Sequence, residues 1–157
     1  MILNDLTDCA ILSHGYLPYN RDYYFFIEID NKDDLSGQYL ITFSHSYDLR
    51  IKSILKSSII KQSLDDLFTD FRNWQNSGEP EGHVWGCNFL VAYPGFSRVF
   101  PSDIALKWTN DLGIEMNELL VETNIYNISL IYNEFKLEKR NDDLGIISKI
   151  SIPIKSK

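Results

Sequence analysis

Apolar side chains alternate with a period of two in several neighbouring segments, and this pattern limits the possible folds more than any other feature of the chain. In residues 23–29, YYFFIEI, the odd-numbered positions are all apolar and share one face of an extended strand. The other face carries Tyr24 and Phe26. We therefore expect a strand here that is covered on both sides.

The same alternation recurs along most of the chain. It predicts strands at about 9–16, 23–29, 38–46, 47–55, 83–95 and 118–140, and an edge strand at about 144–154. Residues 47–55 alternate charged with apolar side chains, which indicates a half-exposed strand near an edge of the sheet. Residues 118–140 are too many for one strand, so we place a break at 123–126.

Two positions in these strands carry specific expectations. His45 falls on the same face as Tyr39, Ile41 and Phe43, which predicts a core histidine rather than an acid or base exposed to solvent. Pro94-Gly95 is a strong turn signal, and we expect it to end the strand that begins near residue 83.

The period changes to that of a helix in two places. In residues 63–78, SLDDLFTDFRNWQNSG, apolar side chains recur at intervals of three and four behind a capping-box pattern. In residues 102–113, Ser102 is a suitable N-cap and Gly113 a suitable stop. The apolar stripe of this second helix is Ile104, Ala105, Trp108 and Leu112.

These elements predict an α+β fold. Adjacent strands joined by short turns pair antiparallel, so we expect one twisted or rolled sheet of six to eight strands with two amphipathic helices packed on a face or an end. A chain of 157 residues fits a single domain spanning 1–157.

Charge and cysteine content limit the partners. The formal net charge is −7 and the 15 Lys and Arg residues are scattered, which argues against nucleic acid and against an anionic membrane surface. A basic protein partner fits this charge better, although many acidic proteins have no such partner. Two cysteines are too few for a disulfide scaffold, and without a signal peptide or a membrane-spanning run we expect a cytoplasmic protein.

Few residues offer chemistry. The three histidines do not have the spacing of metal ligands, and the chain contains no HExxH, CxxC, GxSxG or phosphate-loop motif, so we expect no metal, no cofactor and no enzymatic activity. If a polar pocket exists, its candidate residues are His14, Arg21, Asp22, His45 and Glu122. Two readings of Arg21 stay open: an ion pair with Asp22 that anchors the loop, or a guanidinium presented to an anionic ligand.

Four aromatic residues are candidates for a protein interface. They lie in predicted turns, where exposure is expected: Tyr16, Tyr19, Tyr93 and Phe96.

An ordered set of landmarks covers about residues 8–135: "HGYLPYNRDYYFFIE", "GQYLITFSH", "SLDDLFTDFRNW", "GEPEGHVWGCNFLVAYPG", "SDIALKWTNDLG" and "ETNIYNISLIYNEF". Together they resemble the YxiG-like domain family of small bacterial proteins. The pattern includes His14, Arg21, Asp22, His45, Trp85 and Glu122, and the resemblance implies that these positions hold the fold. Where the family pattern often has a cysteine after "FSH", this chain has Ser46, so any cysteine chemistry of relatives is not carried over.

The resemblance implies no catalytic activity, but it implies an association with loci of secreted toxins. Our first hypothesis is therefore an intracellular immunity-type protein that neutralises a cognate basic toxin by occluding it. The alternatives are a small-ligand or hydrolytic domain with a His/Glu/Arg pocket, and a structural domain that assembles through the 47–55 or 146–154 edge.

Overall fold

The computed structural model describes residues 3–18, 21–30, 36–54, 72, 76, 78 and 90–140. Within them, eight strands form one sheet in the order β4-β7-β6-β5-β1-β2-β3-β8, and all neighbouring pairs are antiparallel. The strands are β1 (Cys9–Tyr16), β2 (Tyr23–Ile29), β3 (Gly37–Phe43), β4 (Tyr47–Ser53), β5 (Leu90–Val99), β6 (Asn117–Thr123), β7 (Tyr126–Tyr132) and β8 (Phe135–Arg140). The antiparallel sheet and its strand number confirm the prediction.

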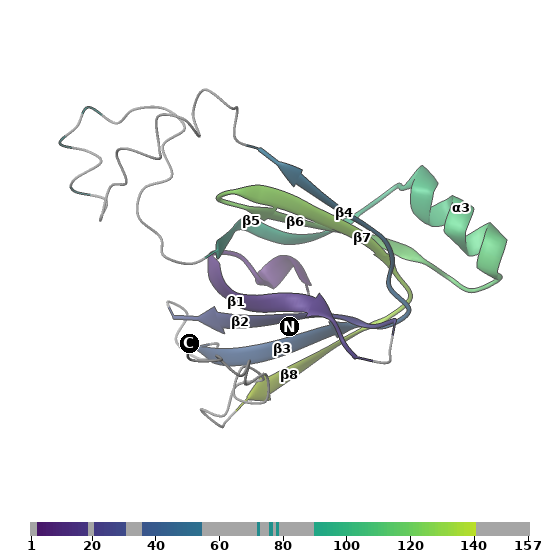
Figure 1. The fold of residues 1–157 in the computed structure, drawn as a ribbon, viewed down its shortest axis with the longest axis horizontal. Coiled ribbons are helices and arrows are strands. Elements are labelled where there is room, and N and C mark those ends of the chain that lie inside the picture. Colours follow the sequence, from purple (N-terminus) through teal and green to yellow (C-terminus); the bar gives the residue numbers. More distant parts are fainter. Residues whose placement is uncertain are drawn as a thin grey trace, which may run out of the picture.

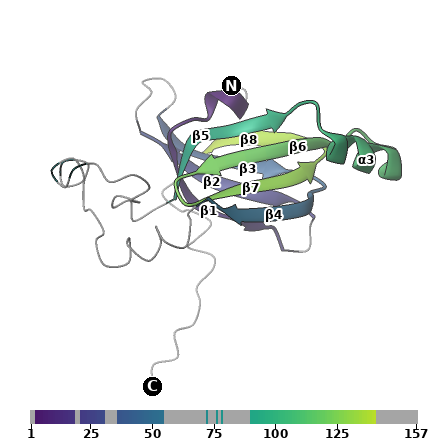
Figure 2. The same cartoon turned by 90° about the horizontal axis from the view of Figure 1, so that it is seen from above.

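The sheet is curled, as Figures 1 and 2 show, so that β4, β7, β6 and β5 face β1, β2, β3 and β8. The main core fills the space between these two halves. Its largest fully buried side chains come from both halves: Phe25, Ile27, Ile41 and Phe43 on one side, and Phe96, Leu119, Val121, Ile128 and Leu130 on the other. Aromatic rings meet edge to face across it, with the Phe25 and Phe96 centroids 5.1 Å apart.

Strand β2 is buried on both faces, as predicted. Phe25 and Ile27 point into the main core, while Tyr24 and Phe26 join Leu40 in a second buried cluster on the opposite face. This explains why the segment is apolar almost throughout instead of alternating cleanly.

Two turns lie together where the chain passes from one half of the sheet to the other. The N–H of Ser44, between β3 and β4, donates to the carbonyl of Glu134, and the N–H of Asn133 donates to the carbonyl of Ser44. The turn at Asn133 separates β7 from β8. The sequence predicted only the earlier break, which the structure confirms between Thr123 and Tyr126.

Pro94-Gly95 does not end its strand, so that prediction was wrong. β5 continues to Val99 through a shift of register between Ala92 and Gly95. Gly95 has a φ of +115°, and a Cβ there would lie 2.3 Å from the carbonyl oxygen of Leu6. The glycine thus serves a bulge and a close approach of the N-terminal segment rather than a turn.

Two helices lie wholly within the described residues, and the isolated positions Arg72 and Asn76 are also helical. The two helices are the 3₁₀ helix η1 (Leu3–Asp5) and the α-helix α3 (Asp103–Leu112). The predicted cap and stop of α3 are confirmed: Ser102 accepts a hydrogen bond from the Ala105 N–H, and Gly113 adopts the left-handed conformation.

Three predicted elements lie wholly or partly outside the described residues. The helix at 63–78 is outside them apart from three isolated positions, the edge strand at 144–154 is wholly outside, and the strand predicted from 83 is described only from Leu90. No helix in the described part of the chain is long and apolar enough to cross a membrane.

Candidate functional site

The first cluster of candidate residues surrounds His14 on β1. Its Nδ1 lies 2.7 Å from the Tyr23 hydroxyl and its Nε2 lies 3.2 Å from the Tyr126 hydroxyl. The imidazole also stacks on the Phe25 ring, with centroids 5.5 Å apart. His14 therefore joins β1 to β2 and to the first residue of β7 on the other half of the sheet.

Burial sets the protonation of this cluster. Burial lowers the pKa of His14 and raises the pKa of Tyr23 and Tyr126, so the imidazole is neutral and both phenols keep their protons near neutral pH. A neutral imidazole donates through one nitrogen and accepts through the other, which matches two hydroxyl neighbours. Both ring nitrogens are thus used inside the protein, an arrangement that stabilises the fold.

The second cluster lies at the turn between β3 and β4. His45 is exposed there with a φ of +48°, so the prediction of a core histidine was wrong. β3 ends at Phe43, and the left-handed backbone at His45 turns its side chain away from the face of Ile41 and Phe43. Asp22 accepts a hydrogen bond from the His45 N–H at 3.2 Å, which ties the turn to the loop before β2.

Arg21 contacts Tyr47, the first residue of β4. Its guanidinium lies over the Tyr47 ring, 5.5 Å from the centroid, and donates to the Tyr47 hydroxyl at 3.2 Å. The side chain is exposed.

Glu122 is separate from both clusters. It lies on β6 opposite Gly95, whereas the hydrogen bonds of His14 go to Tyr23 and Tyr126 and that of the His45 N–H goes to Asp22. The described residues also contain no group of three or more His, Cys, Asp or Glu side chains placed to hold a metal ion. The five predicted polar residues thus lie in three separate places. His14 connects strands of the sheet, the group of Arg21, Asp22 and His45 connects two turns, and Glu122 lies apart on β6.

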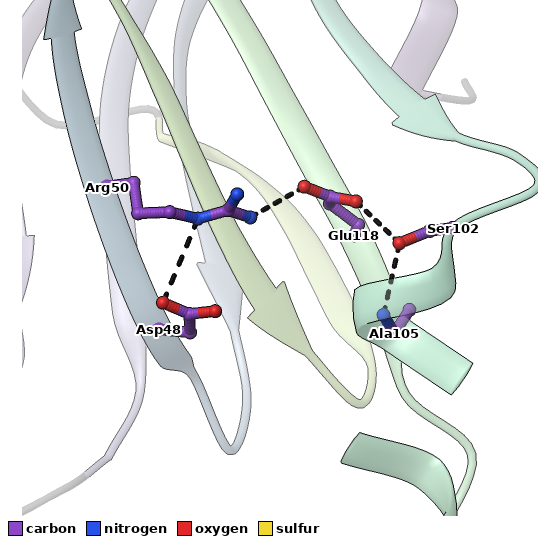
Figure 3. A network of polar contacts seen from close by, with 5 residues as sticks. All are labelled: Asp48, Arg50, Ser102, Ala105 and Glu118. Atoms are coloured by element: carbon purple, nitrogen blue, oxygen red, sulfur yellow. Dashed lines mark hydrogen bonds and ion pairs between the residues drawn. The ribbon is translucent and has the colours of Figure 1, made fainter. Parts of the chain in front are cut away.

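A third region, which the polar candidates did not indicate, is built around helix α3. We call residues 98–117 the α3 corner; Figure 1 shows α3 projecting beyond the sheet. The Glu118 carboxylate, almost buried on β6, accepts from Arg50 Nη2 at 2.6 Å and from the Ser102 hydroxyl at 2.5 Å (Figure 3). Ser102 in turn accepts from the Ala105 N–H, so one chain of polar contacts connects edge strand β4 to the start of the helix.

Stacking on Tyr47 of β4 also holds the helix. The Trp108 and Tyr47 rings are parallel to within 14°, with centroids 5.0 Å apart, and Arg21 lies on the same tyrosine. Ala105 packs with Met116 and Ile131 between these attachments. The helix is therefore fixed both at its cap and through its apolar stripe, which gives it a defined position at the end of the sheet.

Much of the apolar surface of the α3 corner is nevertheless exposed. The relative exposure is 83% for Phe100, 60% for Leu106 and 41% each for Leu112 and Ile114. Phe100 and Leu106 line a hollow of about 330 Å³ together with Val99 and Met116. Leu106 lies outside the predicted apolar stripe, on the polar side of the helix. An apolar residue at such a position is the one feature of the sequence that could have indicated this exposed surface.

The four predicted interface aromatics have different environments. Tyr16 and Tyr93 are exposed, at 47% and 67%, whereas Phe96 is 2% exposed and belongs to the core. The expectation for Phe96 was wrong because Pro94-Gly95 is a bulge, after which the strand returns the side chain to the interior. Tyr19 lies outside the described residues.

Comparison with known proteins gives one result. The model of a family described as YxiG-like protein matches residues 1–146, which is most of the chain. No curated protein and no solved structure matches.

Proposed function

The chain belongs to the YxiG-like protein family, and we propose that it is a protein-binding domain of the immunity type, which neutralises a basic protein toxin by covering its active site. The proposed binding face is the α3 corner. The observation that carries this proposal is the exposure of Leu106, on a helix whose position is fixed, and of Phe100, just before that helix, beside the same hollow.

Exposed apolar side chains are ordinary when they are scattered, but here they gather on helix α3 and on the residues just before and after it. Phe100 and Leu106 line the same hollow, and Leu112 and Ile114 lie at the other end of the helix. Binding a partner would remove this surface from water, at roughly 25 cal/mol per Å² of apolar area. A projecting helix with such side chains resembles the anchors of many protein interfaces.

Charge favours a basic partner. The chain carries a net charge of −7, and at the α3 corner Asp103, Asp111 and Glu115 outnumber Arg98 and Lys107. Two of these acids are in exposed ion pairs, Lys107–Asp111 at 3.4 Å and Arg98–Glu115 at 3.6 Å, so Asp103 supplies the excess negative charge. Complementary charge mainly speeds association and makes the rate fall with added salt.

The hydrolytic alternative has less support. A general acid or base must reach the proton that it transfers, and both nitrogens of His14 are already beside tyrosine hydroxyls. His45 contributes its backbone N–H to a turn, and Glu122 is elsewhere on the sheet.

Assembly through a sheet edge is a second candidate, favoured by one observation. β4 is the last strand of the described sheet on its side, and Ile51 and Ile54 are 53% and 48% exposed. An exposed edge of this kind can accept a further strand. Light scattering across a concentration series tests it, because assembly through β4 predicts a dimer that Ile51→Lys disrupts.

The immunity proposal is tested by co-expression. Cells that produce a toxin encoded beside the gene for this chain should grow when the chain is also produced, and the two proteins should co-purify. The association rate should fall at least several-fold between low and physiological salt. If the chain neither protects the cells nor binds the toxin, the proposal is wrong.

A further inference from the structure

We infer that the α3 corner recognises an extended peptide segment of its partner in which a carboxylate side chain lies between two apolar ones. The inference deepens the proposed function and rests on it, because it takes the same surface as the binding face. Its basis is a second hollow that adjoins the first and shares two residues with it.

The two hollows meet at Arg98 and Asn117, which line both. The second has a volume of about 520 Å³ and is bounded on its far side by Leu3 of η1 and Phe135 of β8. The first lies beside α3 and the end of β5, and the second is lined by residues of the turn between β7 and β8. We treat the two adjoining hollows as one proposed binding groove. We call it the Arg98 groove.

Each end of the groove offers apolar contacts. Phe100 and Leu106 line only the first hollow, whereas Leu3 and Phe135 line only the second. Phe135 is 39% exposed, so apolar surface is open to solvent at this end as well. A ligand that fills both ends must therefore present two separated apolar groups.

The middle of the groove is cationic. The Arg98 side chain is half exposed and forms a 3.6 Å ion pair with Glu115, which is itself 78% exposed. Such a pair contributes little, so a carboxylate from a ligand can replace Glu115 at small cost. The fork of a guanidinium also suits a carboxylate better than it suits a neutral amide.

Acidic residues lie towards the two ends. Asp103 lines the first hollow and Glu134 the second. They favour lysine or arginine outside the apolar anchors of the ligand, which agrees with a basic partner that carries one carboxylate in the bound segment.

An extended chain fits this order of groups. Alternate side chains of a strand share one face and advance about 6.6 Å for every two residues. Three alternate side chains, apolar, acidic and apolar, therefore span about 13 Å, and the inference assigns them to the first hollow, Arg98 and the second hollow in that order.

The test uses a defined peptide and the full chain. The probe is a capped heptapeptide with the order lysine, phenylalanine, serine, glutamate, serine, leucine, lysine, titrated into isotopically labelled protein and followed by NMR. We expect the amide resonances of residues around Arg98, Leu106 and Phe135 to shift. Replacing the glutamate of the peptide by glutamine should raise Kd about fivefold, the upper range for an exposed ion pair.

A double-mutant cycle assigns this effect to Arg98. Arg98→Gln should also raise Kd about fivefold, and glutamine in the peptide should then add almost nothing. Arg140→Gln is the matched control, because it removes one exposed positive charge from the end of β8, and it should change Kd less than twofold. If Arg98→Gln does not fold, the difference in Kd between the glutamate and glutamine peptides on the unchanged protein still tests whether the groove recognises a carboxylate.

The inference is overturned if the peptide produces no shifts at millimolar concentration, or if the two substitutions multiply their effects on Kd. These results are separate from the fate of the proposed function. Protection from the toxin without peptide binding refutes only the Arg98 groove, whereas peptide binding without toxin binding refutes the immunity role.

Discussion

The His14 cluster and the α3 corner both combine polar contacts with aromatic side chains, but these side chains are packed at His14 and partly exposed at the α3 corner. At His14, each polar atom of the ring has a partner inside the sheet, and the aromatic rings around it are packed together. At the α3 corner, polar contacts fix the start of the helix but leave Phe100 and Leu106 exposed. Because the polar atoms of the His14 cluster have partners and its rings are packed, we expect this cluster to stabilise the fold. Because the apolar side chains at the α3 corner are exposed beside a fixed helix, we expect this surface to bind a partner.

The comparison predicts that aromatic residues on one strand differ greatly in their effect on stability. Phe96→Ala removes a fully buried ring that meets Phe25 edge to face, and should lower the free energy of unfolding by about 3–5 kcal/mol. Tyr93→Ala, three residues earlier on β5 and 67% exposed, should change it by less than about 0.5 kcal/mol. Chemical denaturation measures both, and equal losses would break the distinction between core and surface.

A smaller effect is expected at the attachment of α3. Ser102→Ala removes the N-cap and one hydrogen bond to the nearly buried Glu118 carboxylate, which should cost about 1–2 kcal/mol. Amide hydrogen exchange in α3 should be faster in this variant than in the unchanged chain, and the increase should be larger in α3 than in β6. The control is Ser97→Ala, whose hydroxyl makes only a 3.4 Å contact with the Leu120 carbonyl and should cost less. If α3 exchanges as slowly as before, the polar network does not hold the helix.

A still smaller effect is expected from the titration of His14. Because burial lowers the pKa of His14 in the folded protein, the unfolded chain binds more protons there, and His14 makes stability fall as pH drops below 6.5. The slope is less than the limit of about 1.4 kcal/mol per pH unit for one group, and it ends below the folded pKa.

Denaturation between pH 5.5 and 7.5 measures this contribution. His14→Gln should have a flatter stability profile than the unchanged chain. An equal slope in both proteins would show that His14 is not desolvated by the surrounding sheet.

The parts of the fold that depend on local pattern were predictable from the sequence. β2 follows from its apolar residues and α3 from Ser102, Gly113 and the spacing between them. His45 was misplaced because alternation was extended two residues beyond Phe43, where a left-handed backbone ends the strand. A pattern of side chains does not reveal such a change in φ at a non-glycine residue.

The candidate site was harder to predict because its contacts join distant residues. Arg50 and Glu118 are 68 positions apart, and neither was distinguished from other charged residues in alternating segments. Likewise, the Arg98 groove combines η1, β5, β6 and β8, whose proximity depends on the curl of the sheet. Only Leu106 carried a local signal, as an apolar residue on the polar side of its helix.

The central claim is that the α3 corner binds the partner while the packed sheet only supports it. The most direct measurement is the affinity for the toxin of the double variant Phe100→Ser/Leu106→Ser, with Tyr16→Ser/Tyr93→Ser as a matched control at exposed aromatic sites. Both double variants should unfold within about 1 kcal/mol of the unchanged chain, because the four side chains are between 47% and 83% exposed. We predict that the first variant loses at least tenfold in affinity and no longer protects cells, whereas the control keeps both properties. Undiminished binding by the first variant would contradict the account.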